Sequence, residues 1–158
     1  MAKLKVTVPE NSLDIIGEIE IKAPLEKVFE AYIKEEVFVK WFCRGNQVKV
    51  NKFEGKNGGV WDIEEKDPEG NEWGFYGVFH EIADNERIIW TFEFMGMGER
   101  GHVSLEKIEF SKGEGNITKM KSTSTFFNQE DRDGMVDSGM EEGWRKSIEA
   151  LEELLTNE

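Results

Sequence analysis

Apolar and polar residues follow two different periods along the chain, and the first element they predict is a strand. Residues 14–22 place isoleucines on one side and charged residues on the other. Pro24 then stands where a helix can begin, since its missing N–H would have no intrahelical partner there. Apolar residues recur at helical spacing over 25–32 and again over 37–42. We therefore expect two short helices, paired as a helical hairpin and ended by Gly45.

The period changes to two between residues 47 and 127, where turn-forming Gly, Pro, Asn and Asp residues separate short apolar segments. Trp90, Phe92 and Phe94 alternate with polar residues, so we expect a sheet with one covered, apolar face. The short connections favour antiparallel pairing of five or six strands in this part of the chain. The segments predicted as strands are 60–66, 72–82, 87–94, 102–110 and 117–127.

Helical spacing returns near the end of the chain. Apolar residues between 131 and 155 fall at steps of three or four, which predicts a long amphipathic helix. Three glycines weaken its first half, so that part is expected to be bent, frayed or separate from the rest. This order of elements predicts an α+β fold in a single domain, residues 1–158 with a core at about 14–155. In it, a curved antiparallel sheet wraps around the last helix.

Composition narrows the classes of partner. The 158 residues include 33 Asp plus Glu and 20 Lys plus Arg, a formal net charge of −13. Nucleic acids are bound mainly through phosphate neutralisation by clustered Lys and Arg, so this acidic surplus argues against them as partners. No apolar run approaches the roughly eighteen residues of a membrane span, and the first residues lack the apolar stretch of a secretory signal. We expect a cytoplasmic protein, and its oligomeric state stays open.

A single helix cannot cover a broad twisted sheet, so the rest of the apolar face is either covered by the hairpin or lines a cavity. A dry void of about 500 Å³ would cost roughly 12 kcal/mol, comparable to the whole stability of a domain. Such a space would have to be collapsed, wet or filled by a ligand. The alternative for each side chain is ordinary core packing. The candidate ligand-binding residues are Trp41, Phe42, Trp61, Ile63, Phe75, Trp90, Phe92, Met120, Phe126, Met140, Trp144 and Ile148.

Clusters that would indicate catalysis or metal binding are not evident in the sequence. His80 and His102 have no Cys or His at ligand spacing, so we expect no metal site and no cofactor. Cys43 follows Trp41 and Phe42 and is expected to be a small buried apolar residue that forms no internal disulfide. We assign no catalytic residue.

Carboxylates inside aromatic strands leave two possibilities open. Burial of Asp62, Glu64 or Glu93 would raise the pKa into the range useful for acid–base chemistry. Strand alternation instead places them opposite the aromatic residues, on the solvated face.

Hydroxyl-bearing residues and a glycine–methionine segment are likewise ambiguous. Thr118, Ser122 and Ser124 share a strand face with Met120, so they either give an apolar pocket its polar anchors or belong to a solvated strand. Residues 95–101 form either a mobile hairpin loop or a flexible lid over apolar ligands.

Short motifs also recur along the chain in a recognisable order: 19–29 (IEIKAPLEKVF), Trp41, 58–61 (GGVW), 67–70 (DPEG), 77–82 (GVFHEI), 86–91 (ERIIWT) and 141–148 (EEGWRKSI). In this order they resemble the START-like (SRPBCC) superfamily of polyketide cyclases and birch-allergen relatives. The branch most similar is named after the C-terminal domain of the activator of heat shock protein 90 ATPase. The resemblance spans about residues 14–155 and implies the helix-grip fold, a curved sheet gripping a C-terminal helix over a cavity. It carries over no catalytic residue.

Three hypotheses of function follow. The first is a non-catalytic protein that binds a small, largely apolar or aromatic molecule in a cavity between the sheet and the last helix. The second, implied by the resemblance, is a module that associates with a chaperone, although 158 residues leave no room for the separate N-terminal domain of the true cochaperone. The third is a cyclase or hydrolase that uses a carboxylate or His80 as acid or base. The identity of any ligand stays open.

Overall fold

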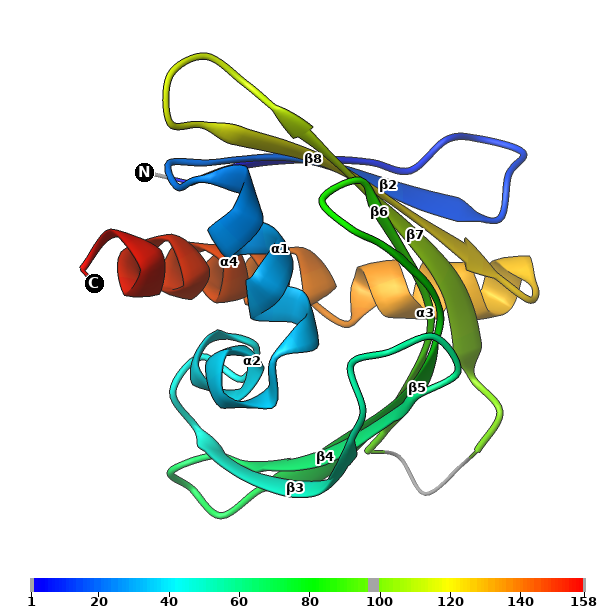
Figure 1. The fold of residues 1–158 in the computed structure, drawn as a ribbon. Coiled ribbons are helices and arrows are strands. Elements are labelled where there is room, and N and C mark those ends of the chain that lie inside the picture. Colours follow the sequence, from blue (N-terminus) through cyan, green and yellow to red (C-terminus); the bar gives the residue numbers. More distant parts are fainter. Residues whose placement is uncertain (1, 97–99, 158) are drawn as a thin grey trace.

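One antiparallel sheet dominates the computed structural model, which describes residues 2–96 and 100–157 (Figure 1). Each strand pairs antiparallel with its neighbours, and the register shifts in two of the pairs. In spatial order the strands of the described residues are β1 (Lys3–Thr7), β2 (Asp14–Ile21), β8 (Thr118–Phe126), β7 (Val103–Lys112), β6 (Arg87–Met95), β5 (Glu72–Ala83), β4 (Val60–Lys66) and β3 (Gln47–Phe53).

The helical hairpin and the last helix lie on the concave side of this sheet (Figure 1). The hairpin of α1 (Leu25–Ile33) and α2 (Glu35–Trp41) connects β2, near one edge, to β3 at the opposite edge. The chain closes with α3 (Gln129–Asp137) and α4 (Met140–Thr156), and the sheet curves around α4 (Figure 1). The α+β architecture and the helix-grip arrangement predicted from the sequence are therefore confirmed.

Two strands at the edges were not among the predicted segments. The five residues of β1 alternate between buried or half-buried apolar residues and exposed polar ones, a pattern too short to stand out. In β3 the register against β4 shifts between Val50 and Lys52, which indicates a bulge or irregularity and interrupts the alternation. The sheet consequently has six strands after the hairpin, in agreement with the upper bound expected from the sequence.

Gly139 divides the predicted last helix into α3 and α4. Of the forms expected for the glycine-containing part, the separate helix is the one observed. Gly139 has φ +82°, a left-handed conformation that costs glycine little and other residues more. The α3 helix begins separately, where the Asn128 side chain accepts a hydrogen bond from the Asp131 N–H at 2.8 Å. The buried Arg132 of α3 donates through Nη1 to the carbonyl oxygens of Pro9 (2.9 Å) and Ser12 (2.6 Å). This guanidinium therefore fastens α3 to the turn between β1 and β2.

Aromatic rings from the hairpin and the central strands fill one half of the concave side. Trp61 of β4 and Trp90 of β6 stack with centroids 4.8 Å apart and an interplanar angle of 29°. Phe38 of α2 meets both rings nearly edge-on, at 5.8 and 6.2 Å. Gly77 of β5 lets Trp61 lie close to the backbone, because a Cβ there would overlap the Trp61 Nε1 and the Thr91 carbonyl oxygen.

Replacing Gly77 with alanine should therefore destabilise the protein by about 1–3 kcal/mol, because the added methyl group collides with a backbone atom and a fully buried ring. The matched control is Gly134→Ala in α3, where a Cβ meets no neighbour within 4 Å. That control should be neutral or more stable by roughly 0.4–1 kcal/mol. Urea unfolding measures both, and equal stabilities of the two variants would show that Trp61 does not require the glycine.

Candidate functional site

Ring contacts join six of the twelve predicted ligand-binding residues. They form one continuous aromatic network over α2, the loop after it and β4–β6. The six are Trp41, Phe42, Trp61, Phe75, Trp90 and Phe92. Within the network, Trp41 also donates its indole N–H to the Ala31 carbonyl oxygen at 2.9 Å, so this ring links the two helices of the hairpin.

The other six predicted residues lie outside that network. Ile63, Met120 and Ile148 are buried in the main apolar core, and Phe126 is buried at the end of β8. Met140 and Trp144 are half-buried on α4. The Trp144 ring packs directly on Gly17 of β2, where any Cβ would overlap it.

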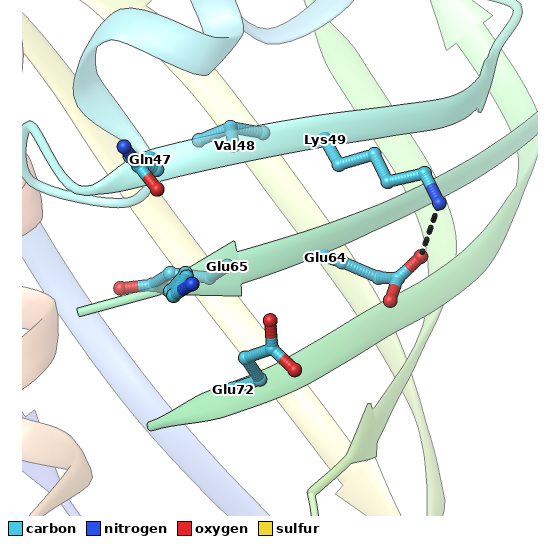
Figure 2. Close-up of a pocket in the computed structure, with 7 residues that line it drawn as sticks. Gln47, Val48, Lys49, Glu64, Glu65 and Glu72 are labelled. Atoms are coloured by element: carbon cyan, nitrogen blue, oxygen red, sulfur yellow. Dashed lines mark ion pairs between the residues drawn. The ribbon is translucent and has the colours of Figure 1, made fainter. Parts of the chain in front are cut away.

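Two pockets of the described residues contain none of the twelve. One, of about 390 Å³, is lined by Gln47, Val48, Lys49, Glu64, Glu65, Lys66 and Glu72. Figure 2 shows this pocket on β3 and β4, with the ion pair between Lys49 Nζ and Glu64 Oε2 at 3.8 Å. The other, of about 150 Å³, lies between the start of α1 and the turn from β7 to β8. The chamber expected between the sheet and the last helix therefore stays a prediction.

Several aromatic rings on the concave side nevertheless keep solvent-accessible surface. Phe92 and Phe94 share the inner face of β6 with the buried Trp90, yet both are only half-buried. Phe42, after α2, and Trp144 on α4 are half-buried as well. We refer to Phe42, Phe92, Phe94 and Trp144 as the accessible rings. They offer apolar surface on the side of the sheet that the helices cover only in part.

A carboxyl group lies on the inner face of the neighbouring strand β7, close to Phe92 of β6. Glu106 of β7 is half-buried, and its Oε1 accepts a hydrogen bond from the Trp90 Nε1–H at 2.7 Å. Its Oε2 accepts from the Ser124 hydroxyl at 2.9 Å and lies 3.5 Å from that of Ser104. Ser104 is the register partner of Phe92 across β6 and β7. We call Glu106, Trp90, Ser104 and Ser124 the Glu106 cluster.

The surroundings of Glu106 change its acidity. Burial raises the pKa of Glu106 above its ordinary value, and the hydrogen bonds from Trp90, Ser124 and Ser104 oppose that rise only in part. Burial also raises the pKa of Tyr32 on α1, and the nearby Glu106 carboxylate adds to this effect. All three groups that contact the Glu106 carboxyl are neutral, so its ionised form has little compensation.

The hydroxyl-bearing face of β8 points inward, which decides between the two alternatives left by the sequence. Thr118, Ser122 and Ser124 are all buried, so the interpretation as a solvated strand is wrong. Thr118 donates to the Ala23 carbonyl oxygen at 2.7 Å and serves to hold the start of the hairpin. Ser124 belongs to the Glu106 cluster, and Ser122 pairs in register with Gly17, beneath Trp144.

The three carboxylates considered from the sequence lie on the outer face, as alternation predicted. Glu64 is exposed and Asp62 is half-buried. Glu93 is not solvated, however, because Arg100 covers it with two hydrogen bonds of 3.0 and 3.1 Å, and the Gly101 N–H adds a third at 2.8 Å. These bonds, those from Arg100 first, hold the pKa of Glu93 below its usual range, which makes it a structural anion and a poor proton donor.

A second inward carboxylate was missed by sequence reasoning. Glu65 is buried and accepts hydrogen bonds from Arg44 Nη2 (2.9 Å), Asn46 Nδ2 (2.6 Å) and Trp73 Nε1 (3.1 Å). This network fixes the loop after α2 against β4 and β5. Cys43 lies beside it, and burial followed by the Glu65 charge raises the pKa of its thiol. The thiol is therefore buried and protonated, in agreement with the structural role expected for it.

The remaining chemical candidates do not reach the concave side or lie partly outside the described residues. His80 of β5 is exposed. The predicted loop or lid of residues 95–101 includes 97–99, which lie outside the described residues. Within residues 2–96 and 100–157, no three His, Cys, Asp or Glu side chains converge as a metal ion would require. None of the helices in these ranges combines the length and apolarity needed to cross a bilayer.

Comparisons with known proteins agree with the fold. The family described as activator of Hsp90 ATPase homolog 1-like protein matches residues 22–156. The crystal structure of Ms6760 from Mycobacterium smegmatis has a TM-score of 0.84 at 17% identity, with 97% of each chain covered. The solution structure of a protein from Arthrobacter aurescens has a TM-score of 0.85 at 21% sequence identity, with 98% of this chain and 92% of the other covered. The solution structure of a protein from Staphylococcus epidermidis has a TM-score of 0.80 at 25% sequence identity, with 96% of this chain and 94% of the other covered. No curated protein matches the sequence.

The raised pKa of Glu106 predicts how stability depends on pH. Between the ordinary value of 4.5 and the higher folded value, the folded state binds more protons than the unfolded state, so Glu106 lowers stability as pH rises through this window. Glu106→Gln keeps the shape but cannot ionise. The free energy of unfolding of this variant, measured with urea, should therefore increase relative to that of wild type as pH rises from about 4.5 to neutral.

The control for this measurement is Glu109→Gln, the same change at an exposed position of the same strand. This exposed control should not reproduce the increase relative to wild type that Glu106→Gln shows as pH rises. If the Glu106 variant also lacks that increase, the Glu106 carboxyl is not held in a poorly solvated site.

Proposed function

The chain belongs to the activator of Hsp90 ATPase homolog 1-like family of the START-like superfamily, and from that premise we propose that it binds a small, largely apolar molecule on the concave face of its sheet. The observation that carries this proposal is the combination of accessible rings and a hydrogen-bonded carboxyl on one inner face. Phe92 and Ser104 are register partners, which places an accessible ring directly beside the Glu106 cluster.

The composition of this face is typical of small-molecule sites. Such sites are mostly apolar and aromatic, with a few fixed polar groups that orient the ligand. Here the accessible rings supply the apolar part, while Glu106 and the hydroxyls of Ser104 and Ser124 supply the polar part. Inward aromatic surface that stays in contact with water is unfavourable, and a ligand that covers it gains free energy in proportion to the apolar area removed from water.

The proposed activity is binding without catalysis. An acid–base reaction on the concave face would have to use Glu106, because His80 is exposed and Asp62, Glu64 and Glu93 lie on the outer face of the sheet. Glu106 has no second carboxyl or histidine among its hydrogen-bond partners in the described chain, so no acid and base pair can be assigned.

Ligand binding should be visible as thermal stabilisation by members of a panel of lipids, aromatic polyketides and flavonoids. Trp144→Leu, which removes an accessible ring, should weaken binding of a stabilising compound by about fivefold, roughly the loss of one aromatic contact. Phe127→Leu is the matched control, because Phe127 is 85% exposed and lies outside the accessible rings. No stabilisation by any class of compound, or equal affinities of the two variants, would contradict the proposed site.

A second candidate is association with a chaperone ATPase, supported by the description of the matching family alone. It requires a protein surface rather than the concave face, so the two functions are separable.

If this second function holds, adding the protein to Hsp90 should raise the rate of ATP hydrolysis in a saturable manner. An ATPase rate that stays constant as the protein is added in excess would remove this candidate.

A further inference from the structure

The Glu106 carboxyl differs from the other inward carboxylate in the kind of partner it has. Glu65 is neutralised by Arg44 at 2.9 Å. Glu106 receives only neutral donors, the Trp90 indole N–H and the serine hydroxyls. Among the ion pairs of the described residues, none involves Glu106. Buried anions in proteins are normally paired with a cation, so an ionised Glu106 lacks the partner that would stabilise it.

We propose that the molecule bound on the concave face is an organic cation, an apolar or aromatic compound with a protonated amine that pairs with Glu106. This inference rests on the proposed function and specifies the chemical class of its ligand. The ammonium group would form a charge-assisted hydrogen bond with the carboxylate, while the apolar part of the molecule covers the accessible rings.

The rings around Glu106 favour a cation for a second reason. Trp90 donates to the carboxylate, and Phe92 stands on the same face of β6, one inward position along the strand. Tyr32 lies against Trp90, with ring centroids 6.0 Å apart. Trp90 and Tyr32 are buried, so Phe92 is the ring of the three that keeps accessible surface near the carboxylate. An aromatic face attracts an ammonium group through its quadrupole, so this ring suits an amine better than a neutral head group.

An anionic ligand, such as a fatty acid, is disfavoured by the same groups. It would bring a second negative charge next to Glu106, in a chain whose formal net charge is already −13. Arg44, the arginine at the edge of this face, is already hydrogen-bonded to Glu65. The concave face therefore discriminates between ligands by the sign of their charge as well as by their apolar area.

Three probes of nearly equal size test the inference: phenethylamine, phenethyl alcohol and hydrocinnamate, which are cationic, neutral and anionic at neutral pH. Isothermal titration calorimetry of the wild-type protein should give an affinity about tenfold higher for the amine than for the alcohol, the effect of about 1.4 kcal/mol from a charge-assisted contact. Hydrocinnamate should bind more weakly than either.

Two variants assign the preference to a residue. Glu106→Gln should bring the ratio of the amine and alcohol affinities close to one. Glu109→Gln, which removes the same charge from an exposed position of β7, should retain the wild-type ratio. If both variants lose the preference equally, it arises from the overall charge of the chain and the role of Glu106 is refuted.

The wild-type measurement decides the inference even if the Glu106 variant fails to fold. Equal affinities for the amine and the alcohol, or tighter binding of hydrocinnamate, would overturn the cationic ligand while leaving an apolar binding function intact. Failure of all three probes to bind, while neutral compounds of the larger panel stabilise the protein, would also overturn it. Failure of the probes and of the whole panel would remove the proposed function itself.

Discussion

The packing of hairpin rings against the inner face of the sheet is the interaction on which the rest of the structure depends. A single helix cannot cover an eight-stranded curved sheet, so α4 leaves much of β4–β6 for the hairpin to cover. Phe38 reaches the stacked tryptophans Trp61 and Trp90, and Trp41 holds the two short helices together through its bond to Ala31. Without this aromatic layer, the apolar side of three strands would have no partner within the fold.

The inner face also accommodates two carboxylates, and they stand in contrasting environments. Glu65 is surrounded by donors that include a cation, and it joins the loop after α2 to the sheet. Glu106 has neutral donors, a raised pKa and accessible aromatic neighbours. The charge of Glu65 is balanced within the protein by Arg44, whereas the surroundings of Glu106 favour a proton or a positively charged ligand on its carboxyl group.

Strand alternation and helical spacing predicted the central strands and the helices, and alternation would also have revealed both inward carboxylates. Glu65 alternates in step with Trp61 and Ile63, so it faces the same side of β4 as they do. In the same way, Glu106 faces the same side of β7 as Ile108 and Phe110. The three carboxylates singled out from the sequence, Asp62, Glu64 and Glu93, lie on the opposite face of their strands. Other features depend on contacts distant in sequence: Arg100 reaches back from the following loop to bury Glu93, and Trp144 packs on a glycine of β2. Such contacts leave no periodic signal.

The guanidinium of Arg132 has a consequence for how the end of the chain is held. It anchors α3 to the turn between β1 and β2, while α4 packs separately against the sheet and the hairpin, and the left-handed Gly139 joins the two helices. The two helices also contact each other, so each one supports the position of the other. The end of the chain is thus attached at two points on the same edge of the sheet, by Arg132 at the β1–β2 turn and by Trp144 on Gly17 of β2, so the first strands and the last helices stabilise each other.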